Sequence, residues 1–260
     1  MSDHQELAHI YRQFITGFAA LDRAFRPVEK SEINGIVRIH WPTEGRRGST
    51  WTDEFFAWES DPAVTLAAVQ SCMPGPRHYL TDAFASGPSN RAFFEANGYV
   101  FEDFEPLMTL ALAGRPRPDS GHTVSSITDL ELANRLTAAQ HAAGSSPRPT
   151  SQTQIDDPTI VLKIALAGDE PAAAGKGVLV EDAFYISDIT TLPSHRKQGY
   201  AAAIMEALHA DAESLGARFA VLCASGMAAN LYRTLGYQDR ATVDRYLPTN
   251  AAEPNETIIV

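Results

Sequence analysis

The stretch from Tyr185 to Leu208 constrains this chain most, because it places a strand, a loop and a helix in immediate succession. The β-branched run 186–191 predicts a strand that stops before Pro193, and the alanine-rich segment that follows Tyr200 predicts a helix. The loop from Arg196 to Ala201 brings backbone N–H groups to the positive end of the helix dipole and adds two cationic side chains. Such a loop suits a pyrophosphate.

Neither of the two commonest phosphate loops occurs in the chain. The sequence contains no Gly-x-x-x-x-Gly-Lys-Ser/Thr pattern and no Gly-x-Gly-x-x-Gly pattern. A strand–turn–helix connection with one glycine and two basic residues is also common where no ligand binds. The segment alone therefore leaves both a phosphate site and an ordinary connection open.

The same segment resembles motif A of the GNAT superfamily of N-acyltransferases. That motif is a hydrophobic strand, a proline and then Arg/Gln-x-x-Gly-x-Gly/Ala at the start of a helix, and Arg196, Gly199 and Ala201 stand at its three diagnostic positions. The resemblance implies an α/β (α+β) fold with a mixed, mostly antiparallel sheet flanked by helices.

A second segment, Arg218 to Tyr237, resembles motif B of the same superfamily. It predicts a buried strand, a short helix that carries Leu231-Tyr232, and a helix end at Gly236. In the family the helical tyrosine protonates the departing CoA thiolate, and Tyr232 matches it. An isolated tyrosine would more simply pack its ring in a core, but two motifs in the family's order and separation favour the catalytic role.

The resemblance also implies where acetyl-CoA binds. In the family the sheet splays after the motif A strand, so free backbone groups of its last residues bind pantetheine and the thioester oxygen. The following loop and first helical turn hold the pyrophosphate, and Ser225 replaces the asparagine of motif B. The cofactor-binding residues expected here are Ile189, Thr190, Thr191, Arg196, Lys197, Gln198, Gly199, Tyr200, Ala201, Ala202 and Ser225.

The sequence leaves the general base open. Where many members carry a glutamate on the next strand, this chain has Cys223. Asp188 is the best placed of the carboxylates near the motif A strand, which also include Glu181 and Asp182, although strand alternation can turn its side chain away. A water relay is the alternative.

Composition bounds the remaining possibilities. The 260 residues are 44% hydrophobic and 20% charged, with a formal net charge of −11, which disfavours nucleic-acid binding and favours a cationic or amine-bearing partner. No apolar run is long enough to span a membrane, and the first residues do not resemble a signal peptide, so we expect a cytoplasmic protein. Two cysteines and eight scattered histidines predict neither a disulfide framework nor a metal site.

The polar segment 113–121 predicts a boundary between a shortened, degenerate GNAT-like domain, 1–115, and a catalytic GNAT domain, 120–260. Residues 84–87 and 93–99 parallel 223–226 and 231–237, which suggests an internal repeat. Phe94 then stands where the second copy has Tyr232, and a phenylalanine cannot donate a proton. The alternative is that strand–helix–strand units simply resemble one another.

Several further elements are predicted by periodicity and caps. Helices are expected over 6–24, 63–72 and from Asp129 to about 142, and strands over 34–41, 122–127, 159–166 and 172–180. The spacing from Pro42 to Gly48 repeats that from Pro193 to Gly199, which could mark a decayed phosphate loop. The residues that follow Gly48 are poor at starting a helix, so a chance match is the better explanation. The polar loop 144–158 either is solvated or borders the acceptor pocket, as in the family; its candidate contacts are Arg148, Gln152 and Gln154.

Two function classes follow. The first is an N-acetyltransferase that moves an acetyl group from acetyl-CoA directly to a primary amine of a small molecule or peptide. The second is a non-catalytic acyl-CoA-binding or dimerisation module, and a homodimer is left open. Retention of Tyr232 favours the enzyme, because a binding module needs no proton donor.

Overall fold

A computed structural model describes residues 3–42, 51–58, 61–83, 88–114, 121–145, 147–226 and 228–251. In chain order the elements of the first half are α1 (Asp3–Arg23), β1 (Glu29–Ile33), β2 (Ile36–His40), β3 (Asp53–Ala57), α2 (Pro62–Ser71), β4 (His78–Asp82), α3 (Pro88–Ala96) and β5 (Tyr99–Ala111). Those of the second half are β6 (Val124–Ser126), α4 (Leu130–Ala142), α5 (Gln152–Asp156), β7 (Ile160–Ala167), β8 (Glu170–Val180), β9 (Ala183–Thr191), η2 (Pro193–His195), α6 (Tyr200–Ser214), β10 (Phe219–Cys223), α7 (Ala229–Thr234), β11 (Gln238–Pro248) and η3 (Thr249–Ala251).

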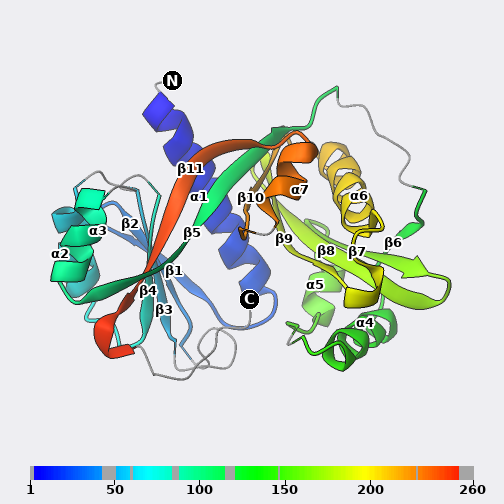
Figure 1. The fold of residues 1–260 in the computed structure, drawn as a ribbon, viewed down its shortest axis with the longest axis horizontal. Coiled ribbons are helices and arrows are strands. Elements are labelled where there is room, and N and C mark those ends of the chain that lie inside the picture. Colours follow the sequence, from blue (N-terminus) through cyan, green and yellow to red (C-terminus); the bar gives the residue numbers. More distant parts are fainter. Residues whose placement is uncertain are drawn as a thin grey trace.

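The strands form a single 11-stranded sheet in the order β1-β2-β3-β4-β11-β5-β10-β9-β8-β7-β6 (Figure 1). The last strand, β11, lies between two strands of the first half, while β5 pairs with β10 of the second half. Between themselves β5 and β11 form a long antiparallel ladder, from Tyr99↔Pro248 to Thr109↔Gln238. Each half therefore completes its part of the sheet with a strand from the other.

Helices cover both faces of this sheet. α1 crosses the middle of the molecule behind β5 and β11 in Figure 1, and its apolar side belongs to one core cluster with residues of α4 and β7. α6 and α7 belong to a second cluster, and α2 and α3 to a third. Strand alternation separates these clusters, because the neighbours Phe55 and Phe56 on β3 belong to different ones.

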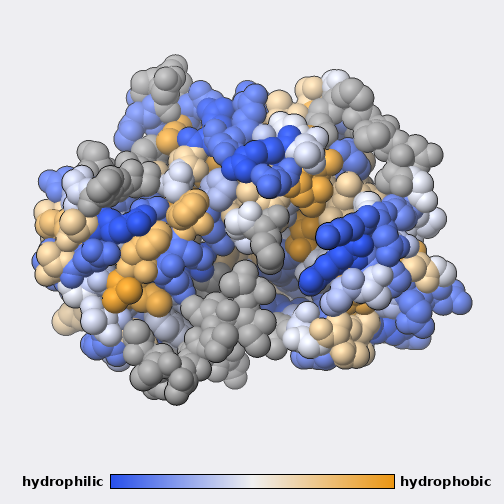
Figure 2. Space-filling view, in the orientation of Figure 1, coloured by the Kyte–Doolittle hydropathy of each residue, from blue (hydrophilic) through white to orange (hydrophobic). Residues whose placement is uncertain are grey.

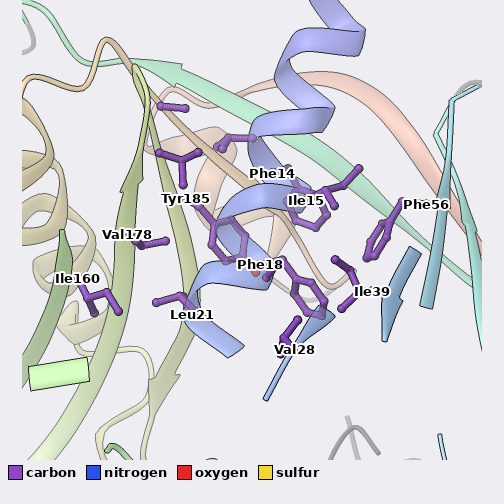
Figure 3. Close-up of a cluster of buried hydrophobic side chains, with 14 of the residues drawn as sticks. Phe14, Ile15, Phe18, Leu21, Val28, Ile39, Phe56, Ile160, Val178 and Tyr185 are labelled. Carbon is purple, nitrogen blue, oxygen red and sulfur yellow. The ribbon is translucent and has the colours of Figure 1, made fainter. Parts of the chain in front are cut away.

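Helix α1 joins the two halves through its buried side. Phe14 and Phe18 contact Phe56 of the first half, and Phe14 also meets Tyr185 of the second half edge-on at a centroid distance of 5.4 Å. Figure 3 shows these rings gathered around the helix. The apolar residues whose spacing predicted this helix thus form the surface that holds the two halves together.

Most expected elements are present with small changes at their ends. The helices expected over 6–24, 63–72 and 129–142 are α1, α2 and α4, and Asp129 caps α4 by accepting a hydrogen bond from the Leu132 N–H. The predicted mixed sheet flanked by helices is confirmed. No helix of the described residues is long and apolar enough to cross a membrane.

One local expectation was wrong, and one strand was missed. The polar loop 144–158 contains α5, whose start is a capping box in which Ser151 and Gln154 bond each other's backbone N–H groups. The pattern Ser-x-x-Gln could have revealed it. Strand β1 was missed because its Glu-Lys-Ser-Glu sequence is exposed and carries no apolar alternation.

The proposed internal repeat corresponds to the same order of elements in each half. The order β3-α2-β4-α3-β5 matches β9-α6-β10-α7-β11, and Phe94 lies on α3 as Tyr232 lies on α7. The matched residues 84–87 lie outside the described residues, as do positions 43–48 of the segment that repeats the phosphate-loop spacing. The order of elements agrees with a tandem arrangement.

A substitution at Gly17 tests the contact between α1 and the second half. A Cβ at this position would lie 2.2 Å from Cβ of Tyr185 on β9. Gly17→Ala should therefore lower the free energy of unfolding by about 1–3 kcal/mol through overpacking, although alanine favours a helix by about 1 kcal/mol. Denaturant unfolding measures this change.

Gly75→Ala is the matched control, because its Cβ would meet only Thr52 Oγ1 at an ordinary 3.6 Å. Equal midpoints for Gly17→Ala and the unsubstituted protein would contradict the close packing of α1 on β9.

Candidate active site

The two central parallel strands of the second half, β9 and β10, separate before β9 ends. β9 and β10 pair only at Ala183↔Phe219, Phe184↔Ala220 and Tyr185↔Val221, although β9 continues to Thr191. The last residues of β9 stay paired with β8 on their other side. The end of β9, including Ile189, Thr190 and Thr191, therefore presents backbone groups to the gap beside β10.

The turn after β9 leads into the unprotected start of α6. Gly199 is the N-cap with φ +88°, and no side chain caps the helix, so the first N–H groups, those of Tyr200, Ala201 and Ala202, have no intrahelical acceptor. Lys197 also has a positive φ of 60°. The exposed side chains of Arg196, Lys197 and Gln198 surround this site, and Figure 2 shows hydrophilic groups over this turn.

His122 supports this turn from the segment before β6. Its Nε2 donates to the carbonyl oxygen of Gln198 at 2.7 Å, and its ring stacks on Tyr200 at a centroid distance of 4.0 Å. A Cβ on Gly199 would lie 3.3 Å from the same Nε2. Sequence reasoning missed His122, since it lies 76 residues before its hydrogen-bond partner and has no local motif.

Asp188 lies at an irregularity in β9. Lys176↔Ser187 and Ala174↔Thr190 are paired, so Asp188 and Ile189 together face Gly175. Asp188 has a positive φ of 54°, which is uncommon for a residue other than glycine. A Cβ on Gly175 would come within 2.4 Å of Ile189 Cδ1, so glycine is required opposite this bulge.

Two cations hold the Asp188 carboxylate. It lies 2.8 Å from Lys176 Nζ and 3.1 Å from Arg148 Nη2. Although burial opposes ionisation, these two cations more than offset it and hold the pKa of Asp188 well below its usual range. Arg148 Nη1 also lies 2.6 Å from Asp22 of α1, which ties the bulge to the first half.

Tyr232 lies on the opposite face of the sheet from α1. It is buried on α7 in the cluster that includes α6, and its ring lies 5.6 Å from that of Tyr237. Desolvation raises the pKa of Tyr232 to about 12, so its hydroxyl keeps its proton at neutral pH. The Tyr237 hydroxyl bonds His209 Nε2 at 2.8 Å.

Ser225 follows β10, and its carbonyl oxygen accepts hydrogen bonds from the N–H groups of Ala228 and Ala229 at the start of α7.

A cavity of about 200 Å³ lies between α1 and the middle of the sheet, at the point where β9 leaves β10. Both halves line it. The second half contributes Arg148, Tyr185, Ser187, Asp188, Cys223, Val243 and Arg245, and the first half contributes Phe14, Phe18, Glu54, Phe56, Thr81 and Glu105. Sequence reasoning missed Glu54, Glu105 and Arg245, because they lie on β3, β5 and β11, which are far apart in the sequence and come together only in the sheet.

The three loop residues predicted to contact substrate are placed differently from one another. Arg148 lines the cavity. Gln154 is buried, and its side-chain amide donates to the carbonyl oxygen of Leu21 on α1. Gln152 is exposed and donates to Asp156 on its own helix, and it does not line the cavity. The described residues contain no group of three or more His, Cys, Asp or Glu side chains placed to hold a metal ion.

Comparisons with known proteins agree with this arrangement. Residues 176–239 match the model of the acetyltransferase (GNAT) domain family, whereas no curated protein matches the sequence significantly. A GCN5-related N-acetyltransferase from Kribbella flavida has 18% sequence identity and a TM-score of 0.69, covering 95% of this chain and 97% of that one. A putative GNAT-family acetyltransferase from Novosphingobium aromaticivorans has 17% identity and a TM-score of 0.54, covering 91% and 95%.

The agreement with solved structures extends over both halves of the chain, and the sequence match falls on the strands and helix that build the candidate site. Residues 176–239 of this chain therefore match the acetyltransferase (GNAT) domain family, and the chain has the fold of GNAT proteins over most of its length.

Proposed function

We propose that this protein is an N-acetyltransferase that transfers an acetyl group from acetyl-CoA directly to a primary amine. One observation carries the proposal: β9 parts from β10 immediately before a helix whose N-terminal N–H groups are uncapped. The gap suits an extended pantetheine arm, and the helix start suits a pyrophosphate. A buried polar atom supports the fit, because Thr191 Oγ1 has no hydrogen-bond partner among the described residues.

Acetyl-CoA supplies the acyl group as a thioester. The backbone at the end of β9, from Ile189 to Thr191, would orient its pantetheine arm and polarise the carbonyl. The turn from Arg196 to Gly199 and the first turn of α6 would hold the phosphates, with Arg196 and Lys197 adding positive charge. Because the turn is exposed, its contribution to binding should weaken as salt is raised.

Tyr232 would act on the sulfur of the departing CoA. A thiol ordinarily titrates near pH 8.5, whereas burial raises the pKa of Tyr232 to about 12. Complete transfer of the tyrosine proton to the thiolate is therefore uphill in this environment. Tyr232 would act first as a hydrogen-bond donor that stabilises the charge developing on sulfur, with solvent resupplying any proton that it gives up.

The role of Asp188 is best assigned to positioning. A carboxylate with a lowered pKa that already binds Lys176 and Arg148 is a weak base at neutral pH. We infer that the two ion pairs stabilise the positive φ of Asp188 and so fix the bulge that aims the following backbone at the thioester. A water relay or another carboxylate would then accept the proton of the amine.

The first half lacks the features that suit CoA. Its strands β3 and β4, which correspond to β9 and β10, pair along their full length from Asp53↔His78 to Ala57↔Asp82, and the Ala83 N–H continues the ladder to Ala57. The following helix, α2, is capped by the Asp61 carboxylate, and Pro62 removes an N–H donor at its first position. Among the described residues of the first half, which leave out 59–60 between β3 and α2, the two strands show no gap and the helix start is capped, which supports a degenerate first half.

Gly199→Glu should abolish CoA binding, because it places a carboxylate and a Cβ where phosphate oxygens meet bare backbone. Isothermal titration calorimetry with CoA measures the loss. Gly216→Glu is the matched control: it introduces the same side chain at nearly the same φ, +89° against +88°, beyond the other end of α6. Unchanged CoA affinity in folded Gly199→Glu would contradict the phosphate assignment.

Tyr232→Phe should lower kcat by about 10²- to 10⁴-fold while CoA affinity and the melting temperature barely change, because only the hydroxyl is lost. Steady-state kinetics measures the effect. Tyr237→Phe is the control, since it removes a neighbouring hydroxyl that bonds His209 and should affect stability more than turnover.

If Tyr232→Phe retains kcat within about twofold while chemistry limits the rate, the loss is below about 0.4 kcal/mol, too small for that role. CoA binding without acetyl transfer to any amine would favour a non-catalytic acyl-CoA-binding module instead.

A further inference from the structure

The turn that leads into α6 adopts a backbone shape that its own residues do not favour. Lys197 has φ +60° and Gly199 has φ +88°, and the left-handed region is unfavourable for most residues other than glycine. Within the turn, Arg196 Nε donates to the carbonyl oxygen of Thr191 at 3.3 Å. The peptide between Gln198 and Gly199, by contrast, is held from outside the turn.

His122 holds this peptide. Its Nε2 lies 2.7 Å from the carbonyl oxygen of Gln198, and because a carbonyl oxygen can only accept, Nε2 carries the hydrogen of this bond. The imidazole stacks on the ring of Tyr200 with a centroid distance of 4.0 Å and an interplanar angle of 29°. Tyr200 is itself buried at the first position of α6. A fixed helix residue therefore sets the direction in which His122 donates.

The hydrogen bond fixes both ends of one peptide unit. The described residues contain no cis peptide, and in a trans peptide the C=O and N–H bonds point in opposite directions. Because the Gln198 oxygen points to His122, the Gly199 N–H points away from the imidazole. Gly199 is the N-cap of α6, so this N–H lies beside those of the first helical turn, which have no intrahelical acceptor.

The opposite orientation of this peptide would weaken phosphate binding. A half-turn of the Gln198–Gly199 peptide would remove one N–H donor from the start of α6 and place a carbonyl oxygen there. That oxygen carries partial negative charge and would repel phosphates, whereas an N–H attracts them. Because Gly199 lacks a Cβ, its backbone permits many orientations, and a contact from outside the turn is needed to select one.

We propose that His122 is a positioning residue for CoA, which holds the Gln198–Gly199 peptide with its N–H toward the phosphates. The inference rests on the CoA-binding part of the proposed function, and it adds a residue that lies outside both family motifs. His122 directly follows residues 113–121, between the two halves, and precedes β6, which packs against α6. The connection between the halves thus leads directly to the phosphate-binding turn.

The test measures CoA affinity by isothermal titration calorimetry in the full chain, at about 50 mM and about 500 mM NaCl. His122→Phe keeps an aromatic ring against Tyr200 but removes the donor. We expect this variant to raise the Kd for CoA at the lower salt concentration by about tenfold, which corresponds to about 1.4 kcal/mol. A loss of this size matches the net contribution of one hydrogen bond.

Two further variants isolate the hydrogen bond. His122→Gln loses the ring but places an amide donor near the position of Nε2, so its Kd should stay within about threefold of that of the unsubstituted protein. His141→Phe is the matched control, because it makes the same exchange on an exposed residue of α4, which packs on the face of the sheet opposite α6. Its Kd should stay within about twofold.

Salt distinguishes an effect on phosphate binding from a general loss of structure. The turn is exposed, so its attraction for phosphates is screened as the salt concentration rises. The ratio of the Kd of His122→Phe to that of the unsubstituted protein should therefore fall to about threefold or less at the higher salt concentration. A merely structural defect would weaken CoA binding by the same factor at both concentrations and would lower the melting temperature.

The outcomes separate this inference from the function on which it rests. If the unsubstituted protein binds CoA, an unchanged Kd in His122→Phe overturns only the role of His122. The same holds for a loss in His122→Gln as large as that in His122→Phe, and for a loss that does not shrink with salt. If the unsubstituted protein binds no CoA at either salt concentration, the proposed function fails and this inference fails with it.

Discussion

The antiparallel ladder between β5 and β11 is the constraint on which the rest of this structure depends. It places the last strand of the chain inside the first half and a first-half strand beside β10. Because the strands are exchanged, the sheet is continuous, and Glu54, Glu105 and Arg245 line one cavity with Cys223. A domain boundary near residues 115–120 stays a prediction, since two halves joined in this way share one sheet.

The two halves use the same order of elements for different purposes. In the second half a short paired segment between β9 and β10, followed by the uncapped start of α6, leaves room and donors for a ligand. In the first half full pairing of β3 with β4 and the Asp61 cap satisfy those same groups internally. Backbone groups that stay unpaired in the second half are thus hydrogen-bonded within the protein at the corresponding described positions of the first half.

Local features of the site could be predicted from the sequence, and long-range ones could not. The strand, turn and helix around Gly199 follow from β-branched residues, a proline and a run of alanines, all within one short segment. Asp188 is paired with Lys176 of β8 and with Arg148 of the 144–158 segment, and Arg148 is paired in turn with Asp22 of α1. Because these residues are far apart in the sequence, no local pattern could predict the ion pairs. The same holds for Glu54, which lies on β3 of the first half and lines the cavity together with residues of the second half.

The central proposal is that the second half of this sheet binds CoA and that the first half does not. Native mass spectrometry of the chain with increasing CoA tests this proposal most directly, because it counts bound molecules per chain without requiring an acceptor. The account predicts saturation at one CoA per chain. Saturation at two would contradict it, because it would mean that the first half binds CoA although its described strands β3 and β4 are paired and Asp61 caps α2.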